Sequence, residues 1–360
     1  MKILVTGAAG FIGAHCVLRL LRDGHHVCGL DNFNDYYDPQ LKHDRVRWVQ
    51  DQAGDFALAR VDLADSVAIH ELFVREQPEV VIHLAAQAGV RYSLENPRAY
   101  LDSNLTGFLN ILESCRHHPV RHLIYASSSS VYGANQHTPY SAHDGVNHPL
   151  SLYAATKKAN ELMAHSYSHL YGLPCTGLRF FTVYGPWGRP DMSPIQFARA
   201  ISEGHPLKLF NYGEHQRDFT YIDDIIESLA RLLERPPKVA PAWDREHPDP
   251  STSMAPWRIY NIGGERPVEL KDYVALLEKH LGRKARVELL PLQPGDVLNT
   301  YADVHELEHD TGFHPQVELD EGLGRFIAWF RDYYPLSIAQ TALASESLAH
   351  TEPVKQRRSL

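Results

Sequence analysis

The chain is poor in cysteine, and its cysteines are not arranged to bind a metal or to form disulfides. Four occur among 360 residues, at Cys16, Cys28, Cys115 and Cys175, and no C-x-x-C pair is present. Scattered thiols of this kind are expected to be reduced and buried. The 22 histidines are more numerous, but pairs such as His25–His26 stand in loop or helix-end contexts, and we interpret the histidines as surface residues. We therefore expect no metal site.

Long apolar runs and an excess of positive charge are also missing. No stretch approaches the ~20 apolar residues of a membrane-spanning helix. The first strand-like run begins at residue 2, which leaves no room for a signal peptide. The net charge of −9 and the pI near 6.2 disfavour nucleic acid and anionic membranes as partners. We expect a cytoplasmic protein with no nucleic-acid or membrane partner, in which local arginines bind any anionic substrate.

Short apolar runs alternate with helical patterns through the first half of the chain. The runs are Ile3–Thr6, Val27–Leu30, Ala57–Val61, Val80–Leu84, Leu123–Ala126 and Cys175–Phe180, and helices are expected at 11–23, 65–76, 97–117 and 151–171. Buried strands separated by helices predict an α/β fold built on a doubly wound parallel sheet. After Phe180 the pattern changes to loops rich in glycine, proline and aromatic residues, with a Pro-rich surface loop at 235–256.

The first apolar run leads into a glycine-rich turn and an amphipathic helix, in the segment KILVTGAAGFIGAHCVLRLLRDGH. Strand, glycine turn and helix are the context of a dinucleotide-binding (Rossmann) site. Gly7 and Gly10 allow the backbone to turn and approach a pyrophosphate, Gly13 allows the helix to pack on the strand, and the helix N-terminus attracts phosphates. The spacing is G-x-x-G-x-x-G, one residue longer than the common motif, so it is a variant.

An acidic residue follows the second strand, at the position that binds a ribose. Asp31 stands eighteen residues after Gly13, where an acid bonds the 2′-hydroxyl of the adenosine ribose and repels a 2′-phosphate. No Lys or Arg occurs between Leu30 and Leu41. The sequence therefore predicts NAD and not NADP as the cofactor. A glycine turn without a ligand is the alternative, and the strand, helix and acid together disfavour it.

Tyr153 and Lys157 lie four residues apart in a segment that is expected to be helical, so their side chains share one face. An ammonium close to a phenol favours the phenolate, and we expect it to lower the Tyr153 pKa from about 10 towards the range of a general base. Serines 127–130 supply hydroxyls at the end of an apolar run. Such a set can remove a proton from a sugar hydroxyl while a hydride passes to a nicotinamide. A Tyr-x-x-x-Lys pair alone is most often an exposed helix surface, and only the predicted nicotinamide site makes it informative.

The glycine motif, Asp31, Ser127–Ser128, Tyr153 and Lys157 together resemble the extended short-chain dehydrogenase/reductase family of nucleotide-sugar enzymes, from residue 2 to about 335. More narrowly, the segments DNFNDYYDPQLK, SLYAATKKANELMAHSYSHLYGLP, LRFFTVYGPWGRPDM and RDFTYIDDI are similar to bacterial and plant UDP-glucuronate 4-epimerases. The resemblance implies an isomerase that converts UDP-glucuronate to UDP-galacturonate through a 4-keto intermediate. It also implies that NAD is held permanently as the cofactor, because no net oxidation occurs.

The resemblance implies two domains and a homodimer. Residues 1–180, completed by part of 218–262, would form the NAD-binding Rossmann domain, and residues 181–335 a smaller α/β region that binds the UDP-sugar. The small and polar composition of residues 337–360 predicts a disordered tail. Dimerisation would use the helices at 97–117 and 151–171, through apolar residues among Leu105, Phe108, Leu109, Leu112, Leu162, Met163 and Leu170. A monomer with a wider core is the alternative.

The resemblance further implies which residues form the site. Ser128, Tyr153 and Lys157 would be catalytic. The cofactor would contact Gly7, Gly10, Phe11, Ile12, Gly13, Asp31, Asn32, Asp62, Leu63, Leu84, Ala85, Ala86, Asn104, Tyr153 and Lys157. The substrate would contact Ser127, Ser128, Ser129, Thr182, Arg189, Arg217 and Asp296, with Thr182 and Arg189 at the sugar carboxylate, Arg217 at the diphosphate and Asp296 at the uridine ribose.

Alternatives exist for single residues of this site. Any one of the serines can instead cap its own backbone at the strand end, and either of Arg189 and Arg217 can form a surface ion pair. Many related epimerases have Arg where Gln293 stands, so one diphosphate contact of the family is in doubt in this chain.

Other activities share this scaffold. Related dehydratases carry Asp-Glu at the positions of Ser129 and Ser130, and UDP-glucuronate decarboxylases carry Glu at the position of Ser130. This chain has neither acid, which favours epimerisation, with a decarboxylase or an epimerase of another UDP-sugar as the alternative. A non-catalytic NAD-binding protein is a further alternative, which the intact Ser128, Tyr153 and Lys157 disfavour.

Overall fold

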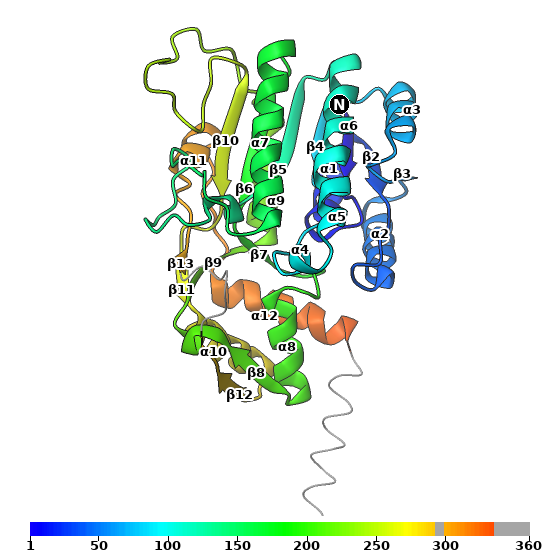
Figure 1. Cartoon of the computed structure of the whole chain (residues 1–360). Coiled ribbons are helices and arrows are strands. Elements are labelled where there is room, and N and C mark those ends of the chain that lie inside the picture. The colour runs from blue at the N-terminus through cyan, green and yellow to red at the C-terminus, as the bar shows by residue number, and fades with distance from the viewer. Residues whose placement is uncertain (292–298, 335–360) are drawn as a thin grey trace, which may run out of the picture.

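The computed structural model describes residues 1–291 and 299–334. Within these residues, seven strands form one parallel sheet in the order β10-β6-β5-β4-β1-β2-β3 (Figure 1). The strands are β1 (Lys2–Thr6), β2 (His26–Asp31), β3 (Ala57–Arg60), β4 (Val80–His83), β5 (His122–Ser128), β6 (Cys175–Phe180) and β10 (Trp257–Ile262). The prediction of a doubly wound α/β fold is confirmed.

Helices cover both faces of the sheet, and each face has its own apolar core. Successive strand residues point to opposite faces, so Val5 and Ile82 belong to one core while Leu4 and Val81 belong to the other. All four are fully buried, which explains why the strands are apolar runs without alternation. One face carries α1 (Phe11–Arg22), α2 (Pro39–Ala53) and α9 (Ile222–Leu232), and the other carries α3 (Ser66–Glu76), α6 (Gly107–His117) and α7 (Leu152–Tyr171).

The strand order reverses at β1. The chain continues from β1 to β2 and β3 on one side, and then returns to β4, β5 and β6 on the other side. At such a switch point the loops after neighbouring strands diverge and leave a crevice at the carboxyl ends of the strands, where ligands bind. The glycine turn follows β1, and the serine run follows β5, so both open into this crevice.

A smaller region lies beyond the carboxyl ends of the strands (Figure 1). Its four-stranded sheet joins β7 (Thr182–Tyr184), β9 (Gln216–Tyr221), β11 (Pro267–Glu269) and β13 (Asn299–Thr300), and β8 (Pro206–Leu209) pairs with β12 (Arg286–Leu289). The helices of this region are α8 (Ser193–Glu203), α10 (Leu270–Leu281) and α12 (Leu319–Tyr333), while α11 (His305–Thr311) packs on β10 and α9. The chain passes between the two regions several times, because β10 and α9 return to the large sheet.

The apolar pattern does not predict α2, although the sequence carries signals for its start. Asp38 caps the helix by accepting a backbone N–H at 2.9 Å, and Pro39 occupies its first turn. Few of its residues are buried, and these include the cations Lys42 and Arg45 beside Leu41 and Val49. A helix that buries charged residues has no apolar stripe, so its period cannot be read from hydrophobicity alone.

The expected continuous helix at 97–117 is interrupted. The chain forms the short helices α4 (Tyr92–Glu95) and α5 (Pro97–Tyr100), a π-helical stretch (Leu101–Thr106), and then α6. Such π segments are rare and widen the helix locally. None of the helices in the described ranges is both long enough and apolar enough to cross a membrane.

Four histidines of the described residues contradict the interpretation of the histidines as surface residues. His15, His83, His122 and His215 are buried, and His83 Nδ1 lies 2.9 Å from Thr6 Oγ1. Burial lowers the pKa of His15 to about 4, that of His83 to about 3 and that of His122 to about 4. The imidazoles of His15, His83 and His122 are therefore neutral polar groups of the core at physiological pH.

Candidate active site

A cavity of about 380 Å³ lies at the carboxyl ends of the strands. It brings together most of the predicted site residues, from both regions of the protein. Those that line it are Gly7, Gly10, Phe11, Ile12, Gly13, Asp31, Asn32, Asp62, Leu63, Leu84, Ala85, Ala86, Ser127, Ser128, Ser129, Tyr153, Lys157, Thr182 and Arg189. Asn104 and Arg217 are not among the lining residues, and Asp296 and Gln293 lie outside the described residues.

The glycine turn fits a phosphate group. Gly7 has φ +72°, and a Cβ there would stand 2.8 Å from the Ala85 backbone nitrogen; a Cβ on Gly13 would stand 1.9 Å from the Gly7 oxygen. Only glycine allows this approach of helix to strand. In the described chain, the first backbone bond of α1 runs from the Ala14 N–H to the Gly10 oxygen at 3.0 Å, so the amides of residues 11–13 have no protein acceptor. Free amides at a helix N-terminus, with the helix dipole behind them, attract an anion.

Asp31 is held firmly at the end of β2. Its carboxylate accepts the Ala9 N–H at 3.1 Å and the Phe33 N–H at 2.9 Å, and the residue is only 7% exposed. These two bonds tie the acid to the glycine turn and leave part of its acceptor capacity for ribose hydroxyls.

Lys42 corrects the expectation that no cation stands near Asp31. Lys42 directly follows Leu41, where the stretch without basic residues ends, and α2 places its Nζ 3.9 Å from Asp31 Oδ1. The ammonium donates to Asn34 O at 2.9 Å and to Asn34 Oδ1 at 2.7 Å. Burial lowers the Lys42 pKa. The preference for NAD therefore depends on the Asp31 carboxylate and not on an absence of positive charge.

Asn104 does not line the cavity and acts one layer behind it. It is 2% exposed, its Oδ1 accepts the Gln87 N–H at 2.8 Å, and its Nδ2 donates to Gln87 O at 3.0 Å and to Thr156 Oγ1 at 3.1 Å. Its amide holds the loop after β4, whose residues Leu84–Ala86 do line the cavity. The direct contact of Asn104 with the cofactor stays a prediction.

Tyr153 lies in the first turn of α7 and lines the cavity together with Ser128. Ser151 begins the helix by accepting the Ala154 N–H at 3.1 Å. Burial raises the Tyr153 pKa, and the nearby Ser128 hydroxyl and the charge of Arg189 oppose that shift. The expected direction, a pKa lowered by the neighbouring lysine, is wrong, because burial has the larger effect.

Lys157 is turned towards the strand end. Its Nζ donates to Ala126 O at 2.9 Å, it is 3% exposed, and burial lowers its pKa to about 8. A lysine with this pKa is mostly charged at neutral pH, yet close to its titration range. The predicted convergence of Ser128, Tyr153 and Lys157 on one cavity is nevertheless found.

The serine run divides into different roles. Ser127 Oγ donates to Glu161 Oε1 at 2.7 Å, and Glu161 also accepts from Arg179 Nε at 2.9 Å, with all three residues buried. The Ser127 hydroxyl therefore donates to a buried ion pair, and its predicted contact with the substrate stays a prediction in which only its acceptor capacity is left. Ser128 Oγ lies 3.1 Å from Ser130 Oγ, and both line the cavity with Ser129.

Arg189 already has a carboxylate partner within the chain. Its Nε donates to Asp191 Oδ1 at 3.1 Å and its Nη2 to Asp191 Oδ2 at 2.5 Å, while the Tyr36 hydroxyl donates to Oδ2 at 3.1 Å. Burial alone would lower the Arg189 pKa, but Asp191 reverses this and raises it. Two of the five N–H groups of a guanidinium are thus used, and three remain for another anion. Thr182, on β7, also lines the cavity.

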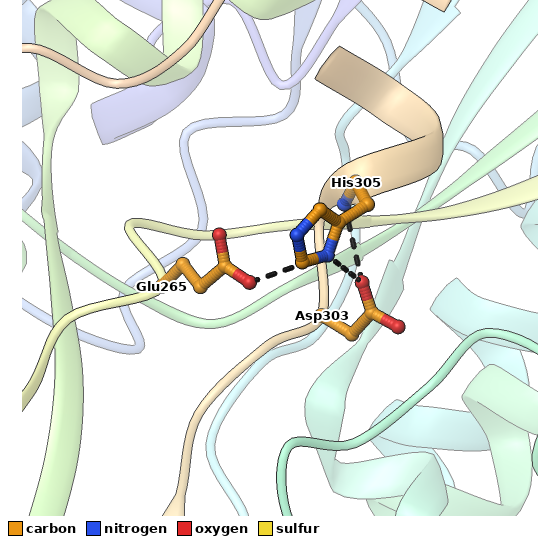
Figure 2. A group of neighbouring side chains, drawn as sticks. All are labelled: Glu265, Asp303 and His305. Atoms are coloured by element: carbon orange, nitrogen blue, oxygen red, sulfur yellow. Dashed lines mark hydrogen bonds and ion pairs between the residues drawn. The ribbon is translucent and has the colours of Figure 1, made fainter. Parts of the chain in front are cut away.

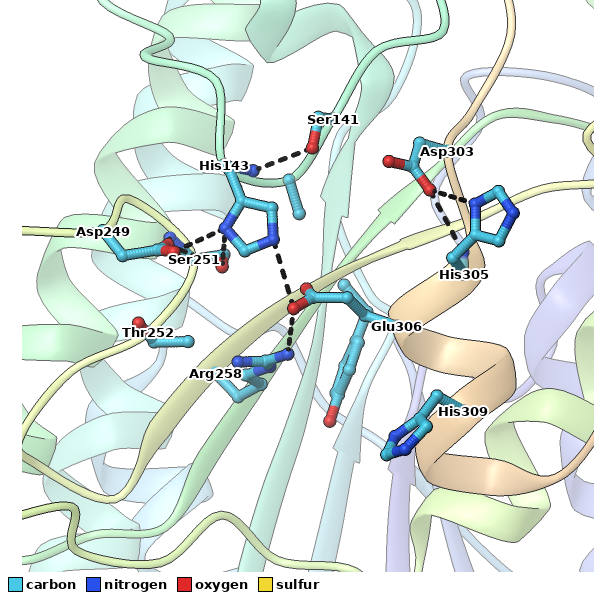
Figure 3. Close-up of polar contacts among 12 residues, drawn as sticks. Ser141, His143, Asp249, Ser251, Thr252, Arg258, Asp303, His305, Glu306 and His309 are labelled. Carbon is cyan, nitrogen blue, oxygen red and sulfur yellow. Dashed lines mark hydrogen bonds and ion pairs between the residues drawn. The ribbon is translucent and has the colours of Figure 1, made fainter. Parts of the chain in front are cut away.

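The predicted Arg217 and a further arginine, Arg258, are not among the residues that line this cavity. Arg217 Nη1, on β9, donates to Gln216 O at 2.9 Å. Arg258 bonds Glu306 at 2.8 Å, and Glu306 in turn accepts from His143 at 3.1 Å (Figure 3). His143 also bonds Asp249 of the Pro-rich loop, so this polar cluster fastens that loop to α11.

A further group of side chains has the residue types of a metal site. His305 Nδ1 lies 2.8 Å from Asp303 and 3.4 Å from Glu265 (Figure 2). The His305 side chain is 75% exposed, and Asp303 raises its pKa. These contacts are accounted for as surface ion pairs, and we assign no metal to them.

Sequence reasoning did not single out the α2 side of the cavity. Tyr36, Tyr37 and Lys42 line it, and Arg45 stands directly behind it. The signal was present in DNFNDYYDPQLK, which joins an acid after a strand to a capped helix start, but its aromatic and basic residues point to no particular chemistry by themselves.

The chain is similar to known proteins over most of its length. The NAD dependent epimerase/dehydratase family matches residues 3–263. The chain is 53% identical to Protein CapI of Staphylococcus aureus, over 93% of this chain and 99% of that protein. It is 48% identical to a probable UDP-glucuronate 4-epimerase of Rhizobium meliloti, over 93% and 98%. Among solved structures, UDP-glucuronic acid 4-epimerase from Bacillus cereus, in complex with UDP-glucuronic acid and NAD, superposes with a TM-score of 0.82 at 33% identity, over 93% of this chain and 100% of that chain.

Proposed function

The chain belongs to the NAD dependent epimerase/dehydratase family, and from this premise we propose that it is a UDP-glucuronate 4-epimerase. It converts UDP-glucuronate to UDP-galacturonate through a 4-keto sugar, with NAD as its cofactor. The observation that carries the proposal is the presence, in one cavity, of Ser128 and Tyr153 for proton transfer and of Arg189 for a carboxylate. The names of the similar proteins, which include UDP-glucuronate 4-epimerases, support the same activity.

The cavity fits NAD on the side of the glycine turn. The free amides at the start of α1 suit the pyrophosphate, and Asp31, held by Ala9 and Phe33, suits the ribose hydroxyls. Asn32 donates to Asp62 at 2.8 Å, which joins the two loops proposed to lie beside the adenine. When bound, NAD would supply the acceptor for the hydride from C4 of the sugar and the donor that returns it to the opposite face of the 4-keto sugar.

Tyr153 and Ser128 move the proton. The Tyr153 oxygen removes the proton from the 4-hydroxyl as the C4–H bond breaks, and returns it when the carbonyl is reduced again. Burial keeps Tyr153 protonated in the resting site, so positive charge and hydrogen bonds must favour the phenolate at the moment of transfer. Ser128 donates to the phenol oxygen or to the sugar oxygen, and Lys157 adds positive charge from behind.

Arg189 and the hydroxyls around it hold the sugar carboxylate. The 4-keto sugar is a β-keto acid: if its C5–C6 bond breaks, CO₂ leaves, the electron pair moves to the C4 carbonyl as an enolate, and C5 takes a proton. This loss is fastest when the C5–C6 bond lies perpendicular to the carbonyl plane. We propose that Arg189, Thr182, Ser129 and Ser130 keep the carboxylate near that plane, so that the sugar is epimerised and not decarboxylated.

The nucleotide half of the substrate is assigned to the smaller region. We retain Arg217 as the proposed diphosphate ligand and Asp296 as the proposed ligand of the uridine ribose. Residues 1–180 with part of 218–262 are proposed to form the cofactor domain, and 181–335 the substrate region. β10 and α9 belong to the first of these by their place on the large sheet.

We further propose that the protein is a cytoplasmic homodimer. Leu109 on α6, with Leu162 and Leu170 on α7, are 40%, 58% and 66% exposed, whereas Phe108 and Leu112 are fully buried against the sheet. The predicted apolar residues therefore divide into a core set and an exposed set, and a partner would cover the exposed set. The four buried cysteines form no disulfide, as suits a reducing compartment.

The function is tested by incubating the purified protein with UDP-glucuronate, without added NAD, and separating the products. UDP-galacturonate should form, with little UDP-4-keto-pentose or UDP-xylose. UDP-glucose, which lacks the carboxylate, should react poorly. Release of mainly pentose products would establish a decarboxylase instead, and equal turnover of UDP-glucose would remove the role given to Arg189.

A further inference from the structure

Arg45, on α2, is an unusual side chain because it is fully buried and carries a charge with no acidic partner. It is 0% exposed, and none of the described residues places a carboxylate within ion-pair distance of it. A buried charge is costly unless it is well hydrogen-bonded. Its donors are instead distributed over three backbone carbonyls and one phenol, from three separate parts of the chain.

Those carbonyls belong to two loops that each contribute residues to the cavity wall, among them Gly7, Gly10 and Arg189. Nη1 donates to Ala9 O at 3.2 Å, within the glycine turn. Nε donates to Trp187 O at 2.9 Å, and Nη2 donates to Gly188 O at 3.0 Å, immediately before Arg189. The fourth acceptor, the Tyr37 hydroxyl at 2.6 Å from Nη1, comes from the loop before α2. A single guanidinium therefore connects the cofactor side of the cavity to the segment that carries Arg189.

The loop held by Arg45 has a conformation that needs support. Trp187 has φ +63°, in the left-handed region that a non-glycine residue adopts at a cost. Its ring packs 5.5 Å from Trp48 of α2 and 5.5 Å from Trp329 of α12. Asp191, further along this loop and the partner of Arg189, accepts a hydrogen bond from the Tyr36 hydroxyl. Residues 36–48 therefore hold the 187–191 loop at three places: its backbone carbonyls, the Trp187 ring and the Asp191 carboxylate.

We propose that Arg45 is a positioning residue for the sugar carboxylate: by clamping the carbonyls of Trp187 and Gly188 to the glycine turn, it sets where Arg189 holds the substrate relative to the cofactor. Arg45 acts through Arg189 and does not itself touch the reacting atoms. The inference rests on the proposed function, because it concerns the carboxylate of UDP-glucuronate. It assigns to α2 a part in deciding between epimerisation and loss of CO₂.

A lysine cannot replace this arginine. The planar fork presents five N–H groups in fixed directions, whereas an ammonium is a single point with three rotating donors. Lys at position 45 could keep one carbonyl bond and the charge, but could not hold Ala9, Trp187 and Gly188 together. Arg45→Lys should therefore loosen the loop while it preserves the buried positive charge.

The test compares wild type with Arg45→Lys, Tyr36→Phe and Arg231→Lys as purified full-length proteins. Arg231 is the control: its Nη1 also donates to two backbone carbonyls, Thr311 O and Gly312 O, each at 3.2 Å, but it does not line the cavity and it also pairs with Glu227 at 2.6 Å. Tyr36→Phe removes the bond to Asp191 at a partly buried position. For each protein we would measure bound NAD, the thermal midpoint, kcat and KM for UDP-glucuronate, and the ratio of pentose to galacturonate products.

The product ratio is the decisive readout, because a loss of stability alone changes how much protein is folded and not what each folded molecule releases. A misplacement of about 1 Å can cost about 10²-fold in rate. We expect Arg45→Lys to retain NAD, to raise KM about tenfold or more, and to raise the pentose share about tenfold. Tyr36→Phe should raise KM and the pentose share by smaller factors. Arg231→Lys should leave KM and the pentose share unchanged.

The inference fails if Arg45→Lys lowers the thermal midpoint while KM and the product ratio stay at wild-type values. If Arg45→Lys does not fold, Tyr37→Phe, which removes the phenol that accepts from Arg45 Nη1 at 2.6 Å, is measured in the same way, and an unchanged KM and product ratio then overturn the clamp. Failure of the proposed function has a different signature, since wild type itself would then form no UDP-galacturonate from UDP-glucuronate.

Discussion

Tyr153 illustrates how several weak effects combine at one residue. Burial raises its pKa, while Ser128 and Arg189 act in the opposite direction. The sequence correctly predicted which residues meet, because a four-residue spacing on a helix fixes a shared face. It could not predict the direction of the pKa shift, since that depends on how much solvent the folded cavity removes.

Tyr153→Phe should reduce turnover by about 10²- to 10⁴-fold, because general acid–base catalysis contributes about that factor. The ring is kept, so the cavity wall and the bound NAD should be unaffected. Activity is followed by product formation from UDP-glucuronate, and the nucleotide is released by denaturation and identified. A variant whose turnover is within about threefold of wild type would remove Tyr153 from the mechanism. The released nucleotide also tests Asp31: recovery of mainly NADP from the wild-type protein would contradict the role given to its carboxylate.

Lys157 makes stability depend on pH. Its pKa is lowered by burial from about 10.5 to about 8, so between these values the unfolded chain binds more protons than the folded chain. The free energy of unfolding should therefore rise with pH across this window. Lys157→Met removes the buried ammonium and should stabilise the nucleotide-free protein near pH 7 by on the order of 3–4 kcal/mol, in line with about 1.4 kcal/mol for each pKa unit.

Denaturant unfolding of both proteins at several pH values measures this effect. The advantage of Lys157→Met should shrink as the pH rises from 8 towards 10. A difference that is constant over that range would show that the folded lysine does not titrate there.

At the scale of elements, α2 contributes more to the site than its sequence suggests. It supplies Lys42 beside Asp31, and Arg45 behind the glycine turn. Its cap and proline were readable from the sequence, but its burial of two cations was not. The burial of Arg45 depends on carbonyls of the 187–188 segment, which is about 140 residues away along the chain.

The start of α2 offers a direct test of its local stability. Asp38 accepts a backbone N–H at 2.9 Å from an exposed position. Asp38→Ala should lower the free energy of unfolding by about 1 kcal/mol, within the range of about 0.5–2 kcal/mol for N-cap residues. Asp38→Asn keeps an acceptor and should cost less. If the two variants are equally stable in urea unfolding, the cap contributes nothing measurable.

At the scale of the whole molecule, the sequence predicted the sheet and the cofactor side of the cavity well. Buried parallel strands are short apolar runs, and a glycine-rich turn between a strand and a helix is typical of nucleotide binding, so both are local signals. The partners of Ser127 and Arg189 were not predicted. Ser127 bonds Glu161 and Arg189 bonds Asp191, and the sequence alone cannot say which side chains of a site already satisfy one another.

The proposed dimer is testable at the exposed face of α7. Leu162 is 58% exposed, and Leu162→Asp would place a charge within the interface. Wild type should sediment as a dimer and Leu162→Asp as a monomer. Val67→Asp is the control, since Val67 is 65% exposed on α3, away from α7. A monomeric wild type would contradict the proposal.

The central claim is that one cofactor removes the hydride from C4 of UDP-glucuronate and returns it to the opposite face. UDP-glucuronate carrying deuterium at C4 tests this directly, with the purified protein, no added NAD and mass spectrometry of the products. The account predicts UDP-galacturonate that retains deuterium at C4. UDP-galacturonate that has lost the label to water, or a labelled pentose as the main product, would contradict it.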